Sequence, residues 1–299
     1  MTNLSYEFDR RPSVAAFMAR ACWPGILRAP LPFPAVTARW RAMPHDPARL
    51  EHFIAATGIE RGPFLPLTYL HVVTFPLQMV ILTAPALPLP IWGTLQIRNR
   101  LLQHRPVPVG APLDVAATVS GQRVVAKGVE LDLHVTADDG AGVAWEALST
   151  CYYRGRFGGP GPPAPSASAP SAPADEVAAW KTPTGGGWRF GHATGDYNGV
   201  HTVGLYARLF GFRGAFFHPH AIVGQCLARL GTPSSPARRL DLWFRGPVHY
   251  GSAVRLSAAS RNEGLDFALR EEGDARPAVL GRLAEARPGV SLLERSTRA

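Results

Sequence analysis

The chain has 299 residues, with 31 basic and 22 acidic side chains, so its formal net charge is +9. Hydrophobic residues make up 46% and charged residues only 18%, which excludes a wholly disordered chain. All basic residues except Lys127 and Lys181 are arginines scattered along the sequence, a pattern that does not favour nucleic-acid binding. Three cysteines (Cys22, Cys151 and Cys226) form no CxxC pair, so we expect a reducing, cytoplasmic setting without a disulfide framework.

The N-terminal region predicts two short helices, over residues 13–22 and 49–57. Acidic residues precede its first apolar run, so we expect no secretory signal. The apolar stretch 67–97 is interrupted by four prolines, which remove backbone donors, and we therefore expect buried core rather than a membrane span. Within it, residues 75–82 predict a buried helix with Pro76 in its first turn.

Alternating apolar residues predict antiparallel strands after this helix. Residues 129–135 alternate, a turn is predicted at Asp138-Asp139-Gly140, and a second strand is predicted over 143–154. Residues 158–174 then contain only Gly, Pro, Ala and Ser, a composition typical of an exposed linker. We therefore predict a first half over residues 1–157, a linker over 158–176 and a second half over 177–299.

The two halves are similar to each other. Residues 106–117 align with 247–258, and residues 75–82 resemble 218–225, at nearly the same separation along the chain. Each half has an apolar helix followed by alternating strands, and packing such a helix against a curved antiparallel sheet is the economical arrangement. The pattern predicts an α+β fold.

The densest polar cluster lies in the second half and contains Asp196, Asn198 and His201. On a regular helix Asp196 and His201 would diverge by about 140°, so their convergence requires a turn. Gly195 and Gly199 would permit one, because glycine tolerates positive φ. A carboxylate beside an imidazole is a candidate proton-transfer site. Asp and Asn are also ordinary turn and capping residues, and that structural interpretation stays open.

The segment resembles the signature of the R-specific enoyl-CoA hydratases, also called hydratase 2 or MaoC-like dehydratases. The matching positions are Phe190, Ala193, Thr194, Gly195, Asp196, Asn198, Val200, His201 and Ala207. Downstream, Gly211-Phe212 and His218 also fit the family pattern. Two positions depart from it, because Gly199 stands where the family has proline and Pro219 where it has glycine. The resemblance implies a double hotdog, with two antiparallel sheets each wrapped around a central apolar helix.

The resemblance also implies a reaction, the reversible addition of water to a trans-2-enoyl thioester of CoA or a carrier protein, giving the (R)-3-hydroxyacyl thioester. Asp196 and His201 would hold the water and move its protons, and Asn198 would orient them. Gly195 and His218 are expected beside the substrate. Because Pro219 has no N–H, we expect the amide of His220 or Ala221 to donate to the thioester oxygen, or the activity to be weakened.

The first half has no counterpart of the Asp–His pair, so we expect one active site per chain. His71 stands alone there and is interpreted as a core histidine. Phe75 and Met79, with Leu82, are predicted to line an apolar acyl channel. Four arginines near the signature are candidates for contacts to CoA phosphates: Arg189, Arg208, Arg213 and Arg245.

Two other functions stay open, a hotdog thioesterase and a non-catalytic protein that binds acyl thioesters. We expect no metal or redox cofactor, although His218 and His220, with His192, His201 and Asp196, are of types that bind metals. The expected partner is an acyl-CoA or acyl-carrier-protein substrate. A homodimer stays open, since pairing of the two halves within one chain removes the need for it.

Overall fold

The computed structural model describes residues 4–21, 32–87, 89, 91, 94–159, 161, 168–231, 235–261, 264–287 and 289–293. The strands are β1 (Leu4–Phe8), β2 (Val36–Met43), β3 (Thr94–Gln103), β4 (Leu113–Val125), β5 (Gly128–Asp138), β6 (Val143–Arg154), β7 (Glu176–Lys181), β8 (Arg238–Phe244), β9 (Ala253–Arg261), β10 (Gly264–Glu271) and β11 (Val279–Glu285). The helices are α1 (Val14–Ala21), α2 (Pro47–Thr57), α3 (Tyr69–Val73), α4 (Phe75–Leu82), α5 (Gly187–Thr194), the 3₁₀ helix η2 (Gly199–His201), α6 (Gly204–Leu209) and α7 (Pro219–Leu230). The helices predicted over 13–22, 49–57 and 75–82 are confirmed by α1, α2 and α4.

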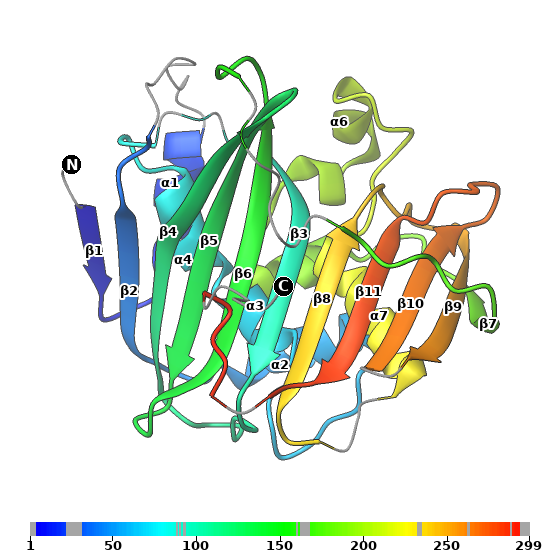
Figure 1. Cartoon of the computed structure of the whole chain (residues 1–299), viewed down its shortest axis with the longest axis horizontal. Coiled ribbons are helices and arrows are strands. Elements are labelled where there is room, and N and C mark those ends of the chain that lie inside the picture. The colour runs from blue at the N-terminus through cyan, green and yellow to red at the C-terminus, as the bar shows by residue number, and fades with distance from the viewer. Residues whose placement is uncertain are drawn as a thin grey trace.

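All these strands form one sheet in the order β1-β2-β4-β5-β6-β3-β8-β11-β10-β9-β7 (Figure 1). The β1–β2 pair is parallel and the others are antiparallel. The two sheets of the expected double hotdog are joined into one, because β3 and β8 pair edge to edge, from Arg98 opposite Trp243 to Gln103 opposite Arg238. Pairing satisfies the backbone groups of two strands that would otherwise both be open edges.

The strand order is mirrored about the β3–β8 junction. Moving outward, β3, β6, β5, β4 and β2 on one side correspond to β8, β11, β10, β9 and β7 on the other. The similar segments 106–117 and 247–258 lead into β4 and β9, which occupy equivalent places. The boundaries of the halves stay a prediction, and linker residues 160 and 162–167 lie outside the described residues.

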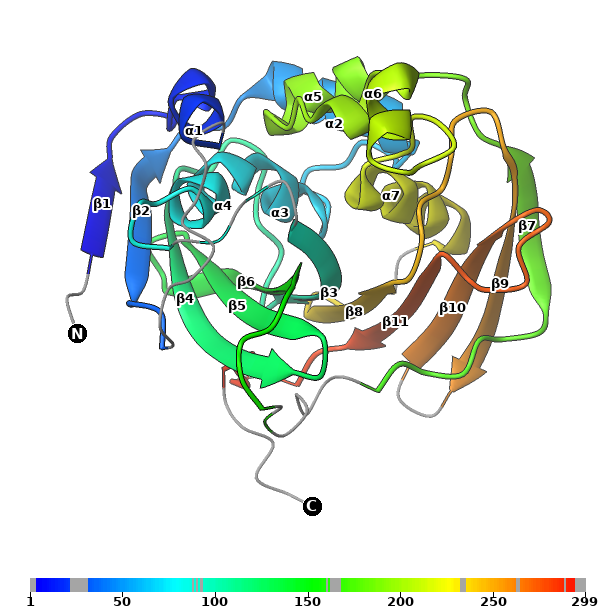
Figure 2. The same ribbon diagram turned by 90° about the horizontal axis from the view of Figure 1, so that it is seen from above.

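The sheet curves around the helices, as expected for a hotdog fold (Figure 2). In α4 every residue after the first is buried, and in α7 every residue from His220 to Leu227 is buried. Leu77 and Ile81 of α4 are both 0% exposed, and full burial of such a side chain contributes about 2 kcal/mol. Both helices carry proline in their first turn, as predicted. None of the described helices is long and apolar enough to cross a membrane.

Helix α2 connects the first half to the helices of the second. Its residue Thr57 packs so closely on α7 that a Cβ at Gly224 would lie 2.3 Å from Cγ2 of Thr57. Gln225 of α7 also donates from Nε2 to the carbonyl of Ala56, at 3.2 Å. Glycine at position 224 therefore permits the close approach of the two helices, which places α2 beside the segment that carries Asp196.

Candidate active site

Three successive side-chain turns shape the segment that carries the predicted catalytic residues. Helix α5 ends at Gly195, whose φ of +87° is left-handed, as predicted. Thr194 Oγ1 then accepts the N–H of Asp196 (2.8 Å), and Asp196 Oδ1 accepts the N–H of Asn198 (2.9 Å). Asn198 Oδ1 accepts the N–H of Val200 (3.3 Å), which starts η2. This is the non-helical bend that brings Asp196 and His201 together.

Gly199 acts differently from the prediction. It is not among the described glycines with positive φ, so the expected left-handed turn there is wrong. A Cβ at Gly199 would lie 2.5 Å from Cδ1 of Tyr206. The missing side chain therefore makes room for the Tyr206 ring of α6, which packs on the segment.

Asp196 faces two histidines. Its Oδ2 lies 3.9 Å from Nε2 of His201 and 3.5 Å from Nε2 of His218. All three side chains are largely buried, with 12%, 10% and 11% exposed for Asp196, His201 and His218. His201 Nδ1 lies 3.1 Å from the carbonyl oxygen of Phe216. Because that oxygen only accepts, Nδ1 carries a proton, and the other ring nitrogen faces the carboxylate.

His218 is oriented from the opposite side. Its Nδ1 accepts the backbone N–H of His220 at 3.2 Å, which leaves the proton of the neutral ring on Nε2, directed at Asp196. Burial lowers the pKa of His218 to about 3, while the nearby Asp196 charge opposes the shift. A neutral His218 therefore directs an N–H toward the carboxylate.

The amides of His220 and Ala221, expected to donate to the thioester oxygen, have other partners in the first turn of α7. The N–H of His220 is directed to His218 Nδ1, and the N–H of Ala221 donates to the carbonyl of His218 at 2.9 Å. Both amides thus have partners within the turn. His218 caps the N-terminus of the helix, and Pro219 is the first helical residue. Neither is free for a thioester oxygen in this conformation.

A buried histidine contact links the two halves beside the site. The rings of His71 and His220 lie 4.0 Å apart between centroids, and Asn99 Nδ2 lies 3.4 Å from the His71 ring nitrogens. Both ring nitrogens of His220 are buried without a hydrogen-bond partner. The sequence indicated a core histidine at position 71, but nothing in its local pattern indicated contact with His220.

These histidines are expected to make the fold sensitive to acid. Burial lowers the pKa of His71 to about 3 and that of His220 well below its usual value. The unfolded chain, where the pKa is about 6.5, then binds more protons between pH 6.5 and 3. The free energy of unfolding should therefore fall as pH falls, by about 1.4 kcal/mol per pH unit for each histidine. Urea unfolding at pH 7.5 and 5.0 measures this; His71→Gln should flatten the dependence, whereas His45→Gln should not.

Two arginines from the first half hold the last turn of α5, a contact the sequence analysis missed. Arg11 donates from Nη2 to the carbonyl of Thr194 (3.0 Å), and Arg49 donates from Nη1 to the carbonyl of Ala193 (3.4 Å). Asp46 fixes Arg49 through a 2.7 Å contact to Nε. Cationic side chains at a helix C-terminus hydrogen-bond its unpaired carbonyls and interact favourably with the negative end of the helix dipole. These arginines therefore fix the residues directly before Gly195 and Asp196.

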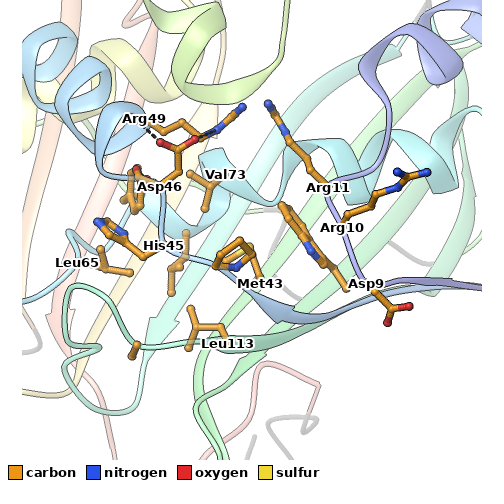
Figure 3. A pocket seen from close by; sticks show the side chains of 15 residues that line it. Asp9, Arg10, Arg11, Met43, His45, Asp46, Arg49, Leu65, Val73 and Leu113 are labelled. Atoms are coloured by element: carbon orange, nitrogen blue, oxygen red, sulfur yellow. Dashed lines mark hydrogen bonds and ion pairs between the residues drawn. The ribbon is translucent and has the colours of Figure 1, made fainter.

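The same arginines border a cavity of about 380 Å³ between β2 and α3 (Figure 3). Part of its lining is apolar (Trp40, Met43, Leu65, Leu70, Val73 and Leu113), and the rest includes Asp9, Arg10, Arg11, His45, Asp46 and Arg49. This volume falls in the range of small-molecule sites. Phe75 and Met79 are not among its lining residues; Phe75 packs edge-on against Phe17 of α1. No group of three or more His, Cys, Asp or Glu among the described residues is arranged to hold a metal ion.

The comparisons with known proteins agree with this geometry. No family model matches the chain. It is 29% identical over 247 residues, 82% of this chain and 87% of the relative, to the 3-hydroxyacyl-thioester dehydratase X of Mycobacterium tuberculosis. The crystal structure of HtdX from that organism superposes with a TM-score of 0.72 at 25% identity, covering 84% of this chain and 100% of that one. The MaoC-like dehydratase from Phytophthora Capsici has a TM-score of 0.66 at 17% identity, over 88% and 97% of the two chains.

The fold is therefore a double hotdog, as predicted. The chain is similar in sequence and fold to these dehydratases, the family that its signature segment resembles.

Proposed function

We propose that this protein catalyses the reversible hydration of trans-2-enoyl thioesters to (R)-3-hydroxyacyl thioesters. The observation that carries the proposal is the convergence of Asp196 and His201, 3.9 Å apart, at the glycine-hinged bend of a double hotdog. The M. tuberculosis relative, named a 3-hydroxyacyl-thioester dehydratase, supports the same reaction class.

The proposed mechanism places one water between the carboxylate and the imidazole. A water molecule can hydrogen-bond both groups across 3.9 Å, and Nε2 of His218 faces the same carboxylate at 3.5 Å. As the water oxygen bonds to C3 of the enoyl group, one water proton passes to the pair, and C2 receives a proton in exchange. Addition and proton return on the same face make the hydration syn, and the face of C3 that is turned to the bound water sets the (R) configuration. Asn198 acts by shaping the turn that holds His201.

An assay with crotonyl-CoA tests this reaction against its rivals. We expect loss of the conjugated-thioester absorbance and formation of (R)-3-hydroxybutanoyl-CoA, which chiral chromatography identifies. A thioesterase would instead release free CoA, detected with a thiol reagent. A non-catalytic binding protein would be stabilised thermally by the ligand without either product.

We propose that the first half receives the acyl tail in the cavity between β2 and α3. Its walls are in part apolar, and two of its lining arginines, Arg11 and Arg49, touch the carbonyls that precede Gly195. This cavity replaces the channel along Phe75 and Met79 as the proposed path of the acyl tail.

Filling the cavity should shorten the preferred acyl chain. Val73→Trp is expected to lower kcat/KM for dodecenoyl-CoA by about tenfold or more while sparing crotonyl-CoA, because the indole occupies space the longer tail needs. Met79→Trp on α4 and Val143→Trp at an exposed position are the comparison variants. If Met79→Trp alone changes chain-length preference, the tail follows α4 instead.

The remaining parts of the proposal concern organisation and setting. Residues 1–157 complete the fold and residues 177–299 carry the single Asp–His pair. The described thiols, Cys151 and Cys226, are free and buried, which suits a reducing cytoplasm. The substrate handle is CoA or a carrier protein. Pairing of the halves within the chain leaves a homodimer as an addition rather than a requirement.

A further inference from the structure

Helix α6 presents apolar side chains to solvent. Leu205 is 70% exposed and Leu209 is 78% exposed, and the flanking Val203 and Phe210 are 44% and 46% exposed. Leu205 and Leu209 are four residues apart and so lie on one face of the helix, while Ala207 on the inner side is 0% exposed. Helix α6 stands at the edge of the molecule, clear of the sheet (Figure 1). An apolar stripe of this kind outside the core indicates an interaction surface.

The charges around this stripe are positive. Arg208 is exposed and lies three residues after Leu205, on the same face, whereas Arg213, although 63% exposed, is paired with Glu271. Between residues 187 and 217 the only acidic residue is Asp196, which is turned into the active site and only 12% exposed. We call Leu205, Arg208, Leu209 and Phe210 the α6 surface. It combines apolar groups with arginine and has no exposed carboxylate.

The α6 surface is next to the catalytic pair. The N–H of Val203 donates to the carbonyl of Gly199 at 2.8 Å, and the N–H of Ala207 donates to the carbonyl of Val203 at 3.0 Å. The Tyr206 ring lies against Gly199. Helix α6 is thus continuous with η2, which carries His201, and a macromolecule on its outer face would lie beside the active site.

We propose that the α6 surface docks an acidic carrier protein that delivers the acyl group as a thioester. This rests on the proposed hydratase function and specifies its substrate handle. The phosphates of CoA can pair with arginines, but they do not account for exposed leucines at helical spacing. A carrier protein with acidic and apolar surface side chains fits both features, through charge complementarity and a small, transient interface.

Kinetics with two handles test the proposal. The same crotonyl group is supplied on CoA and on an acidic acyl carrier protein, and KM is measured for wild type, Leu205→Gln/Leu209→Gln and Arg208→Glu. For the carrier-bound substrate we expect KM to rise by about tenfold or more in both variants. For crotonyl-CoA we expect kcat and KM of Leu205→Gln/Leu209→Gln to change less than about twofold, because the polar CoA handle gains little from exposed leucines. Added salt should raise KM for the carrier substrate more than for CoA.

Control variants and a binding measurement separate this proposal from the proposed reaction. Val177→Gln on β7 and Arg154→Glu at the end of β6 change an exposed apolar and an exposed basic residue elsewhere and should leave both handles unaffected. Surface plasmon resonance with saturated butanoyl carrier protein measures docking without turnover. Carrier binding that the α6 variants weaken supports the proposal even if wild type hydrates nothing.

Three results would overturn it. One is an equal effect of the α6 variants on both handles, which would assign Arg208 to CoA phosphates. Another is the absence of carrier binding or an unchanged carrier KM in the variants. The third is a dimer, seen by sedimentation, that the leucine variants dissociate, which would assign the α6 surface to a second copy of this chain.

Discussion

Asp196→Asn should lower kcat for crotonyl-CoA hydration by about 10²- to 10⁴-fold, the range for loss of a general acid–base group. The amide oxygen can still accept the N–H of Asn198, so the turn is kept, but no basic oxygen faces the water. An amide also cannot stabilise positive charge on His201, which lies 3.9 Å from Oδ2. Stopped-flow or steady-state absorbance measures the rate, and circular dichroism verifies that the variant is folded.

A double-mutant comparison tests whether Asp196 acts together with His201. His201→Ala alone should cost a similar factor, and the double variant should lose little more, because groups that act as a unit are not additive. Asp175→Asn, at an exposed position before β7, is the matched control and should retain full activity. Wild-type rates in both single variants would contradict the assignment of the site.

Local sequence patterns predicted the elements whose structure depends mainly on residues adjacent in the sequence. Residues 75–82 contain no charged side chain and carry proline at the second position, which is sufficient to predict a buried helix starting there. Gly195 was predictable because a chain reversal between two polar residues needs a residue that tolerates positive φ. The hairpin strands β5 and β6 followed from alternation interrupted by Asp138-Asp139-Gly140.

Long-range pairing is what the sequence could not supply. Strands β3 and β8 join the two halves into one sheet, but no local pattern specifies that Asn99 lies opposite Leu242. The orientation of His218 depends on where the N–H of His220 points, a detail of the helix start rather than of composition. The role of Gly199 depends on the distant ring of Tyr206.

The Arg11 contact illustrates the same limit and leads to the second large effect. Arg11 and Thr194 are 183 residues apart, and only the fold brings the guanidinium to that carbonyl. Arg11→Met should lower kcat by about 100-fold, since a displacement of about 1 Å at a catalytic group can cost that much. KM should change little, because the side chain acts through the position of Asp196.

A purely structural role would give a different result. Loss of stability alone would lower the thermal midpoint and the active fraction, leaving kcat per active site unchanged after active-site titration. Arg11→Lys keeps a cation near the carbonyl of Thr194 and should recover part of kcat, whereas Arg41→Met, at an exposed position of β2, should retain wild-type kinetics. Faster hydrogen exchange at residues 193–201 in Arg11→Met would tie the lost rate to the turn itself. An unchanged kcat in that variant would mean that the three side-chain turns hold Asp196 in place without help from the first half.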